Sequence, residues 1–155
     1  MNKNRFVRII SLVYFTMPAF LISCGINESE ETVIIDPILI GKGSITITEG
    51  LSQQNVVITD TCAWNELKSK MDYVNYVSGS FTETEINFSD YMILASLSEI
   101  RGIGGCSIEM ILIEEFSEII EVTIENKIPR IGLAIVCQDY HIVKIPKTNK
   151  HIIFK

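Results

Sequence analysis

The sequence predicts a mainly β fold of the α+β class: an antiparallel sheet, small barrel or sandwich, with one helix packed on it near residues 62–72. Apolar and polar residues alternate with period 2 through most of the chain after residue 40, which is typical of half-buried strands. The connections between these segments are short, which favours antiparallel neighbours. A single good stretch has helical spacing, so we expect one helix.

Two short strands are expected at the start of the domain. Ile45 and Ile47 alternate with threonines, and a β-branched run, QNVVITD, occupies residues 54–60. Alternation and β-branched residues both favour extended backbone on a half-buried surface.

The expected helix, CAWNELKSKMD, has its apolar residues on one face. Asp60 or Thr61 can cap its first turn, since a side-chain oxygen there accepts a free backbone N–H. The residues on the apolar face are Trp64, Leu67 and Met71. We therefore expect Trp64 to anchor the helix in the core.

A loop and then a rapid succession of strands follow the helix. Residues 74–90 have the Ser, Thr, Gly and Asn content of a loop. In the segment NKIPR, Pro129 bars continued strand pairing. The six expected strands are 91–97, 107–115, 118–126, 131–138, 140–147 and 151–155. No repeat or second domain is visible, so we expect one domain over 41–155.

Residues 1–23 have the layout of a signal peptide, with Lys3, Arg5 and Arg8 before an uncharged run. The run ends in LISC, which resembles the bacterial lipobox, where the peptidase cuts before the cysteine and that cysteine carries lipid. We therefore expect lipidation at Cys24 and a tether over 24–40. The expected location is the cell envelope, lipid-anchored to the outer membrane on its periplasmic face or at the cell surface.

The net charge of the chain argues against one class of partner, nucleic acids. Removing residues 1–23 takes three of the 13 Lys and Arg and none of the 19 Asp and Glu, which leaves a net charge of about −9. Without a basic stripe to neutralise phosphates, we expect no nucleic-acid partner. Glu28, Glu30 and Glu31 either keep the tether solvated or resemble the surface-export signal of some bacterial lipoproteins, and both interpretations stay open.

The glycine-rich stretch RGIGGCSIEM at 101–110 has the composition of a phosphate-binding loop. Such a loop needs a helix after its glycines, whose N–H groups then face the anion. Here an alternating, strand-like segment follows. We interpret the glycines as a tight turn between strands.

No motif predicts a metal, a cofactor or a catalytic centre. The chain lacks the spacings CxxC, HxxxH and HExxH. A thiol enzyme would need a cysteine near a histidine and an orienting carboxylate, and no local signature supports that arrangement. The residues from which it could be built are Cys62, Cys106, Cys137, His141 and Asp139. We expect no enzyme activity.

Three cysteines remain besides Cys24, so the mature chain can hold at most one internal disulfide. The candidate pairs join positions 62 and 106, 62 and 137, or 106 and 137. Three free buried thiols are the alternative, and the residues alone leave these outcomes open.

Four segments, INFSDYMILASL, RGIGGCSIEMILI, VTIEN and YHIVKIPK, resemble the C-terminal domain of the PrcB-like protease-complex family over about residues 56–155. The sharpest pieces are GGCSIE (104–109) and CQDYHIVKIPK (137–147). Members are often bacterial lipoproteins, and the founding member is a non-catalytic subunit associated with a subtilisin-like protease. The resemblance implies a binding module that serves as an accessory or stabilising subunit of an envelope protein complex, with a protease as the expected partner.

This chain departs from the family pattern at three positions. Cys106 replaces an aromatic residue, Cys137 a threonine and Asp139 a proline. Two of the departures are cysteines, one in each block, which favours a bridge between Cys106 and Cys137 if the blocks are neighbours.

The same two blocks supply the expected partner contacts. These residues can equally serve as determinants of the fold. They are Gly102, Gly104, Gly105, Tyr140 and His141. Two other functions stay open: a protease inhibitor of the chagasin type, which presents loops from a β-sandwich, and a thiol enzyme of unknown type.

Overall fold

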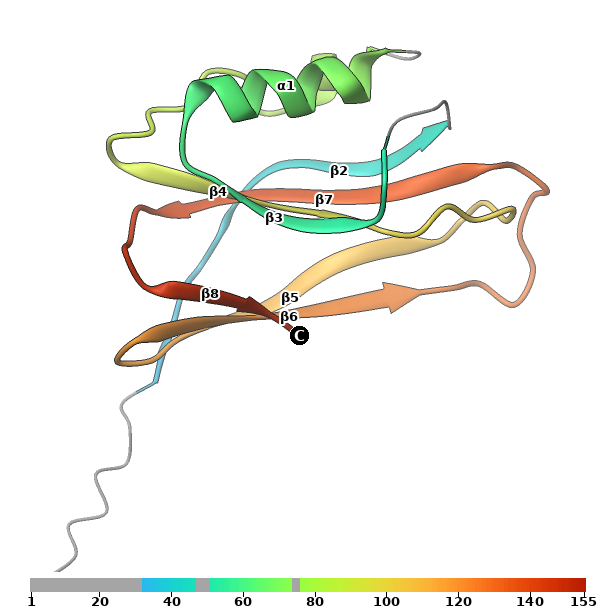
Figure 1. The fold of residues 1–155 in the computed structure, drawn as a ribbon. Helices are drawn as coiled ribbons and strands as arrows, with labels where there is room; N and C mark the ends of the chain where they lie inside the picture. The colour runs from blue at the N-terminus through green and yellow to red at the C-terminus, as the bar shows by residue number, and fades with distance from the viewer. Residues whose placement is uncertain (1–31, 47–50, 74–75) are drawn as a thin grey trace, which may run out of the picture.

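Two four-stranded sheets stack face to face, and one helix covers the outer face of the first (Figure 1). The computed structural model describes residues 32–46, 51–73 and 76–155. In the first sheet the strand order is β2-β7-β4-β3, and in the second it is β1-β5-β6-β8. The mainly β sandwich with one packed helix that the sequence predicts is confirmed, without closure into a barrel.

The elements follow one another in the order expected for a β-rich α+β domain. The first half contains β1 (Val33–Ile34), β2 (Ile38–Thr46), β3 (Gln54–Ile58), α1 (Thr61–Asp72), the 3₁₀ helix η1 (Ser78–Ser80) and β4 (Tyr91–Leu97). The second half contains β5 (Ser107–Glu115), β6 (Ile119–Lys127), β7 (Cys137–Pro146) and β8 (His151–Phe154). β1 and the start of β2 lie within 24–40, so part of the expected tether belongs to the fold.

The first sheet is the middle layer, and both of its faces are buried. Along β4, Ile93 and Ala95 face the helix, whereas Met92 and Leu94 face the second sheet. A strand buried on both faces needs apolar residues on both, which explains the nearly continuous apolar sequence of β4. The fold therefore has two cores, one on each side of this sheet.

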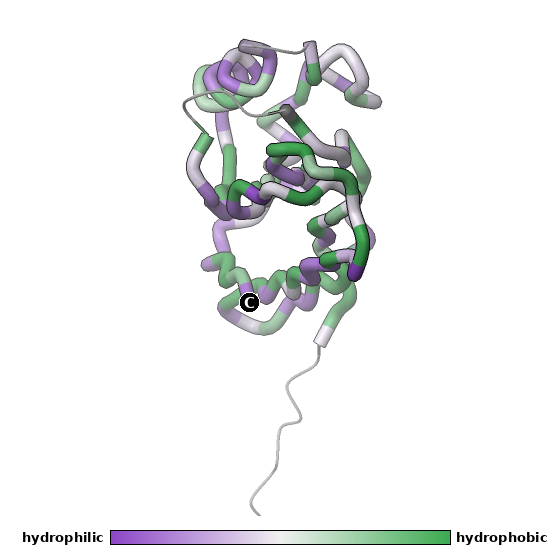
Figure 2. Tube along the Cα trace, turned by 90° about the vertical axis from the view of Figure 1, so that its right-hand side faces the viewer, coloured by the Kyte–Doolittle hydropathy of each residue, from purple (hydrophilic) through white to green (hydrophobic). Residues whose placement is uncertain are grey.

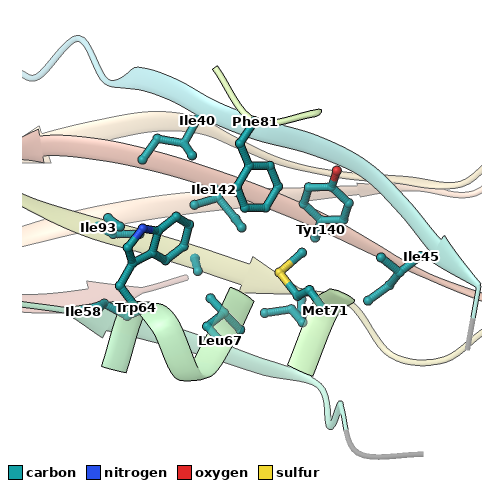
Figure 3. Close-up of a cluster of buried hydrophobic side chains, with 12 residues drawn as sticks. Ile40, Ile45, Ile58, Trp64, Leu67, Met71, Phe81, Ile93, Tyr140 and Ile142 are labelled. Carbon is teal, nitrogen blue, oxygen red and sulfur yellow. The ribbon is translucent and has the colours of Figure 1, made fainter. Parts of the chain in front are cut away.

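The helix is held to the middle sheet by its predicted apolar face. Trp64, Leu67 and Met71 point onto the sheet, as Figure 3 shows. The Trp64 ring stacks on Phe81 with centroids 5.7 Å apart, and its Nε1–H donates to the Thr84 carbonyl at 2.9 Å. Asp60 caps the helix by accepting the Ala63 N–H at 2.9 Å, so the cap is Asp60 and not Thr61.

Two sequence expectations about strands are wrong. Residues 131–138 do not form a strand of their own, because the chain must cross there from β6 in one sheet to β7 in the other. Pro129 and Gly132 lie in this crossing, and regular structure resumes only at Cys137. The pairing is also not antiparallel throughout, since β8 runs parallel to β6 with Ile119 opposite His151.

The sandwich has two unlike ends. At one end, which we name the hairpin end, β5 turns into β6 and β1 pairs with the last residues of β5. At the other, the loop end, β4 and β6 finish and β5 and β7 begin, so the long connections 98–106 and 128–136 both lie there. The chain enters the described fold at the hairpin end, opposite the loop end (Figure 1).

Candidate binding surface

The two connections at the loop end are joined through their backbones. Arg101 and Cys137 exchange two hydrogen bonds, N–H to carbonyl at 2.9 and 3.0 Å. Further along, the Gly104 N–H donates to the Leu133 carbonyl at 2.8 Å. RGIGGCSIEM does lie between two strands, as predicted, but its glycines belong to the long connection 98–106 between the sheets and not to a tight turn, and this connection packs against residues 128–136.

Glycines make this close approach feasible. A Cβ on Gly132 would lie 2.2 Å from the Gly104 carbonyl oxygen, and a Cβ on Gly104 would lie 2.5 Å from Cγ2 of Ile135. Gly105 has φ +87°, a conformation that residues with a side chain rarely adopt. Gly102 is different, since a Cβ there meets nothing within 4 Å. Three of these four glycines are thus required by the loop geometry.

The connection 128–136 presents a group of exposed apolar side chains, which we name the apolar surface. Ile131 and Leu133 are 91% and 79% exposed. The members of the apolar surface are Ile128, Ile131, Leu133, Ile135 and Val136. Figure 2 looks onto this end and shows the connection crossing between the sheets as a mainly hydrophobic stretch.

A cavity of about 420 Å³ lies where the two connections meet. Its lining is mostly apolar and includes both loops and the start of β7. The lining residues are Ser44, Gly104, Gly105, Pro129, Ile131, Gly132, Leu133, Ile135 and Cys137. Sites that accept an apolar group are commonly concave, apolar and edged by a few polar groups, and this cavity has that character.

A buried polar network links the connection 98–106 to β7 and β2. The Asp139 carboxylate accepts a hydrogen bond from the Ser44 hydroxyl, and the Asp139 backbone exchanges hydrogen bonds with Ser98. The Arg101 guanidinium lies 3.9 Å from the same carboxylate through Nη1, which is buried and donates no hydrogen bond within the described chain. This network fixes both ends of the connection from Ser98 to Arg101. No motif in the sequence indicated it.

The two cysteines of the sequence blocks lie at the roots of the two connections. Both thiols point to one backbone oxygen: the carbonyl of Ile103 is 3.4 Å from Sγ of Cys106 and 3.7 Å from Sγ of Cys137. Both are buried free thiols, so the predicted bridge stays a prediction. Burial, with Asp139 nearby, raises the pKa of the Cys137 thiol, which disfavours the thiolate needed for nucleophilic attack.

Tyr140 lies in the helix-side core and does not reach the surface. Its ring packs on Phe81 at 6.1 Å between centroids and against the backbone of Gly41 and Gly43 (Figure 3). Only 3% of the residue is exposed. Tyr140 is therefore a determinant of the fold and not part of the surface that a partner could touch.

His141 is buried on the opposite face of β7, between the two sheets. Its Nδ1 accepts the Met110 N–H at 3.0 Å, next to the bulge in β5 where the pairing with β6 shifts register between Met110 and Leu112. Burial lowers the pKa of His141, and the nearby Lys42 ammonium acts in the same direction. His141 therefore joins the sheets in its neutral form, and its role is structural.

The structure thus divides the expected contact residues into two groups. Gly102 and Gly105 are exposed at the loop end, where a partner can reach, whereas Gly104, Tyr140 and His141 are buried. Sequence reasoning missed the apolar surface because IGLAIVCQ has the composition of a strand. Pro129 and Gly132 were the available signals that this segment is a connection.

Metal ligands, membrane-spanning helices and the expected anchor are the remaining features to consider. Among the described residues, no group of three or more potential ligands could hold a metal ion, and no helix is long and apolar enough to cross a membrane. The expected signal peptide and Cys24 lie outside the described residues.

Comparison of the chain with protein-family models, with curated proteins and with solved structures found no match. The resemblance of the four sequence segments to the PrcB-like family therefore stays a prediction.

Proposed function

We propose that this chain is a lipid-anchored binding module of the cell envelope and a non-catalytic accessory subunit of a protein complex. The observation that carries the proposal is the apolar surface on 128–136, where Ile131 and Leu133 are almost fully exposed. Contiguous exposed apolar side chains on a globular domain are costly in water and mark interaction sites. We accordingly propose that the partner binds at the loop end.

The direction of the tether favours a protein partner over the anchoring membrane. The chain enters its fold through β1, which pairs with the last residues of β5 at the hairpin end. A lipid at Cys24 would hold that end toward the bilayer, so the apolar surface would face away from it. An apolar patch directed away from the membrane is suited to a protein.

The surface also has the layout of a protein interface. Its cavity of about 420 Å³ has room for a large apolar side chain, of the kind that supplies most binding energy in such contacts. Arg130, in the same connection, would accept acidic residues at the rim, whereas Lys127 already pairs with Glu125 and Glu109. The proposed partner therefore presents an apolar anchor with acidic neighbours, and the resemblance to the PrcB-like family suggests a protease.

The test is capture of partners by the full-length chain from the envelope in which it is expressed, followed by mass spectrometry. Changing Ile131 and Leu133 together to serine should reduce the recovered partner at least tenfold. The matched control changes Val33 and Ile34 to serine, because these residues are also exposed and apolar but lie at the hairpin end. A partner retained equally by both variants, or no reproducible partner, would refute the proposal.

A protease inhibitor of the chagasin type is the second candidate. The observation that favours it is that two connections, 98–106 and 128–136, meet at one end of the sandwich, as a loop-presenting inhibitor requires. Assays of papain-like and subtilisin-like proteases with the full chain separate the two functions. Inhibition that the Ile131 and Leu133 changes abolish would support the inhibitor, and binding without inhibition would support the accessory subunit.

A further inference from the structure

We infer that Cys106 and Cys137 form a disulfide when the chain folds in an oxidising compartment, and that this bond pins the two connections of the loop end together. The separation of the sulfurs cannot exceed the sum of their distances to the Ile103 carbonyl, 3.4 and 3.7 Å. Both side chains face the same backbone oxygen, so the bond forms when they rotate from that oxygen toward each other until the sulfurs are about 2.05 Å apart.

The backbone already holds the two cysteines in register. Cys137 is fixed to Arg101 by two hydrogen bonds, and Arg101 lies on the connection that ends at Cys106. Cys106 precedes the first residue of β5 in one sheet, and Cys137 is the first residue of β7 in the other. The bond would therefore cross-link the two sheets at the loop end, directly beneath the cavity.

Cys62, the third described cysteine, lies away from the other two and cannot compete for either as a disulfide partner. Cys62 is exposed in the first turn of α1, just after β3, which ends near the hairpin end. The helix lies on the outer face of the middle sheet, away from the second sheet (Figure 1). Of the three candidate pairs, only Cys106 with Cys137 is brought together by the fold.

The reaction is thiol–disulfide exchange with an oxidising disulfide, either a small molecule or a dithiol oxidase. One cysteine thiolate attacks a sulfur of the oxidant and forms a mixed disulfide, and the second displaces the oxidant as a thiolate. In sum, the protein loses two S–H bonds and gains one S–S bond, while the S–S bond of the oxidant breaks and its two sulfurs, one leaving at each step, take up the two protons and end as two thiols. Because burial raises the pKa of Cys137, exchange is fastest during folding, before the loops close.

The effect of this disulfide on partner binding rests on the proposed function. A cross-link under the cavity holds both loops in one arrangement, and a surface ordered in advance loses less entropy when a partner binds. Reduction would leave the apolar surface in place but less ordered, so partner capture should weaken without disappearing.

The test uses the full chain expressed in a bacterial envelope, with free thiols alkylated before extraction and peptides mapped by mass spectrometry without reduction. We expect one linked peptide pair containing Cys106 and Cys137, with Cys62 alkylated. Reduction should lower the midpoint of thermal unfolding by roughly 10 °C, and should have no such effect on a variant with both Cys106 and Cys137 changed to serine. Cys62→Ser is the matched control and should retain the linked pair.

The outcomes separate this inference from the proposed function. Recovery of Cys106 and Cys137 as alkylated free thiols, a bond from either to Cys62, or an unchanged unfolding midpoint after reduction would overturn the inference. A linked pair in a chain that captures no partner would support the disulfide while the proposed function fails.

Discussion

Gly104 and Gly132, from different connections, set how closely the two halves of the loop end approach each other. Each is placed where a side chain would meet the other loop: the Ile135 side chain for Gly104 and the Gly104 carbonyl for Gly132. The second contact is the stricter one, because a backbone atom cannot rotate away as a side chain can. The sequence indicated a turn at Gly104, but nothing in it identified Gly132 as its counterpart.

We predict that Gly132→Ala destabilises the fold by about 1–3 kcal/mol, since the added Cβ forces the two backbones apart. The matched control is Gly102→Ala, which should change the free energy of unfolding by less than about 0.5 kcal/mol because its Cβ would meet nothing within 4 Å. Urea unfolding followed by circular dichroism measures both. Equal effects of the two substitutions would contradict this account of the loop end.

His141 shows how a residue that attracts attention in a sequence can be explained by the fold. It satisfies a backbone donor, the Met110 N–H, beside the bulge where the pairing of β5 with β6 shifts register. Only the neutral ring can do so through Nδ1. The charged groups near it are Lys42 on β2 and Glu109 on β5, and they act on its pKa in opposite directions.

The lowered pKa of His141 predicts a specific loss of stability on acidification. The unfolded ring takes up a proton near pH 6.5 but the folded ring does so only at lower pH, so the free energy of unfolding falls as the pH drops below about 6.5 toward the folded pKa. His141→Gln keeps an acceptor for Met110 without titrating, and should flatten this part of the profile. Urea unfolding between pH 7.5 and 5 tests it.

The control for that profile is the exposed His151. His151→Gln should leave the slope of the wild-type profile unchanged. Stability lost through paired carboxylates such as Glu109 appears at still lower pH, because the hydrogen bond from Lys42 lowers the pKa of Glu109. A His141→Gln profile as steep as that of the wild type would show that His141 is not the group responsible.

At the scale of elements, the helix α1 illustrates what periodicity can predict. Its apolar spacing placed Trp64, Leu67 and Met71 in the core, and all three are buried. The structure adds what spacing cannot reveal: the partner ring is Phe81, and the indole N–H is satisfied by Thr84. Both partners come from the segment 74–90, which the sequence showed only as a loop.

We predict that Trp64→Ala lowers the free energy of unfolding by about 3–5 kcal/mol, since it empties the centre of the helix-side core. Asn65→Ala on the exposed face of the same helix should cost less than about 0.5 kcal/mol. Chemical denaturation followed by circular dichroism gives both values. If the two substitutions cost the same, α1 does not dock through Trp64.

Strands were predictable where a local sequence pattern marks them. The bounds 91–97 and 107–115 agree with β4 and β5, because alternation or continuous burial fixes these strands locally. The prediction of a strand at 131–138 is wrong because this segment has to cross the distance between the two sheets, which no local sequence pattern shows. The parallel pairing of β8 with β6 was missed for the same reason.

On the scale of the whole molecule, the fold gives the proposed anchor a direction. β1 and the β5–β6 turn lie at the hairpin end, and the apolar surface lies at the other. The sequence predicted an anchor and a domain separately. Only the strand order connects the two and shows which end of the domain the lipid would leave free.

We predict that Cys24→Ser abolishes acylation and leaves the chain with residues 1–23 still attached, because in the proposed lipoprotein both lipidation and cleavage would take place at that cysteine. Metabolic labelling with a fatty-acid analogue and intact-mass measurement report both changes. Cys62→Ser is the matched control and should be labelled as the wild type is. Acylation that persists in Cys24→Ser would remove the basis of the proposed anchoring.

The register of the middle sheet has a consequence for how the chain folds. β2 pairs with β7, so Ile38 lies opposite Lys144 and Thr46 opposite Cys137, about 100 residues along the chain. Non-local pairing of this kind slows folding, since a long segment must close before any contact forms. The β5–β6 hairpin is the one local strand pair among the described elements, and we expect it to form first. We expect the middle sheet to be completed later, because β7, which lies between β2 and β4, comes after all its other strands in the sequence.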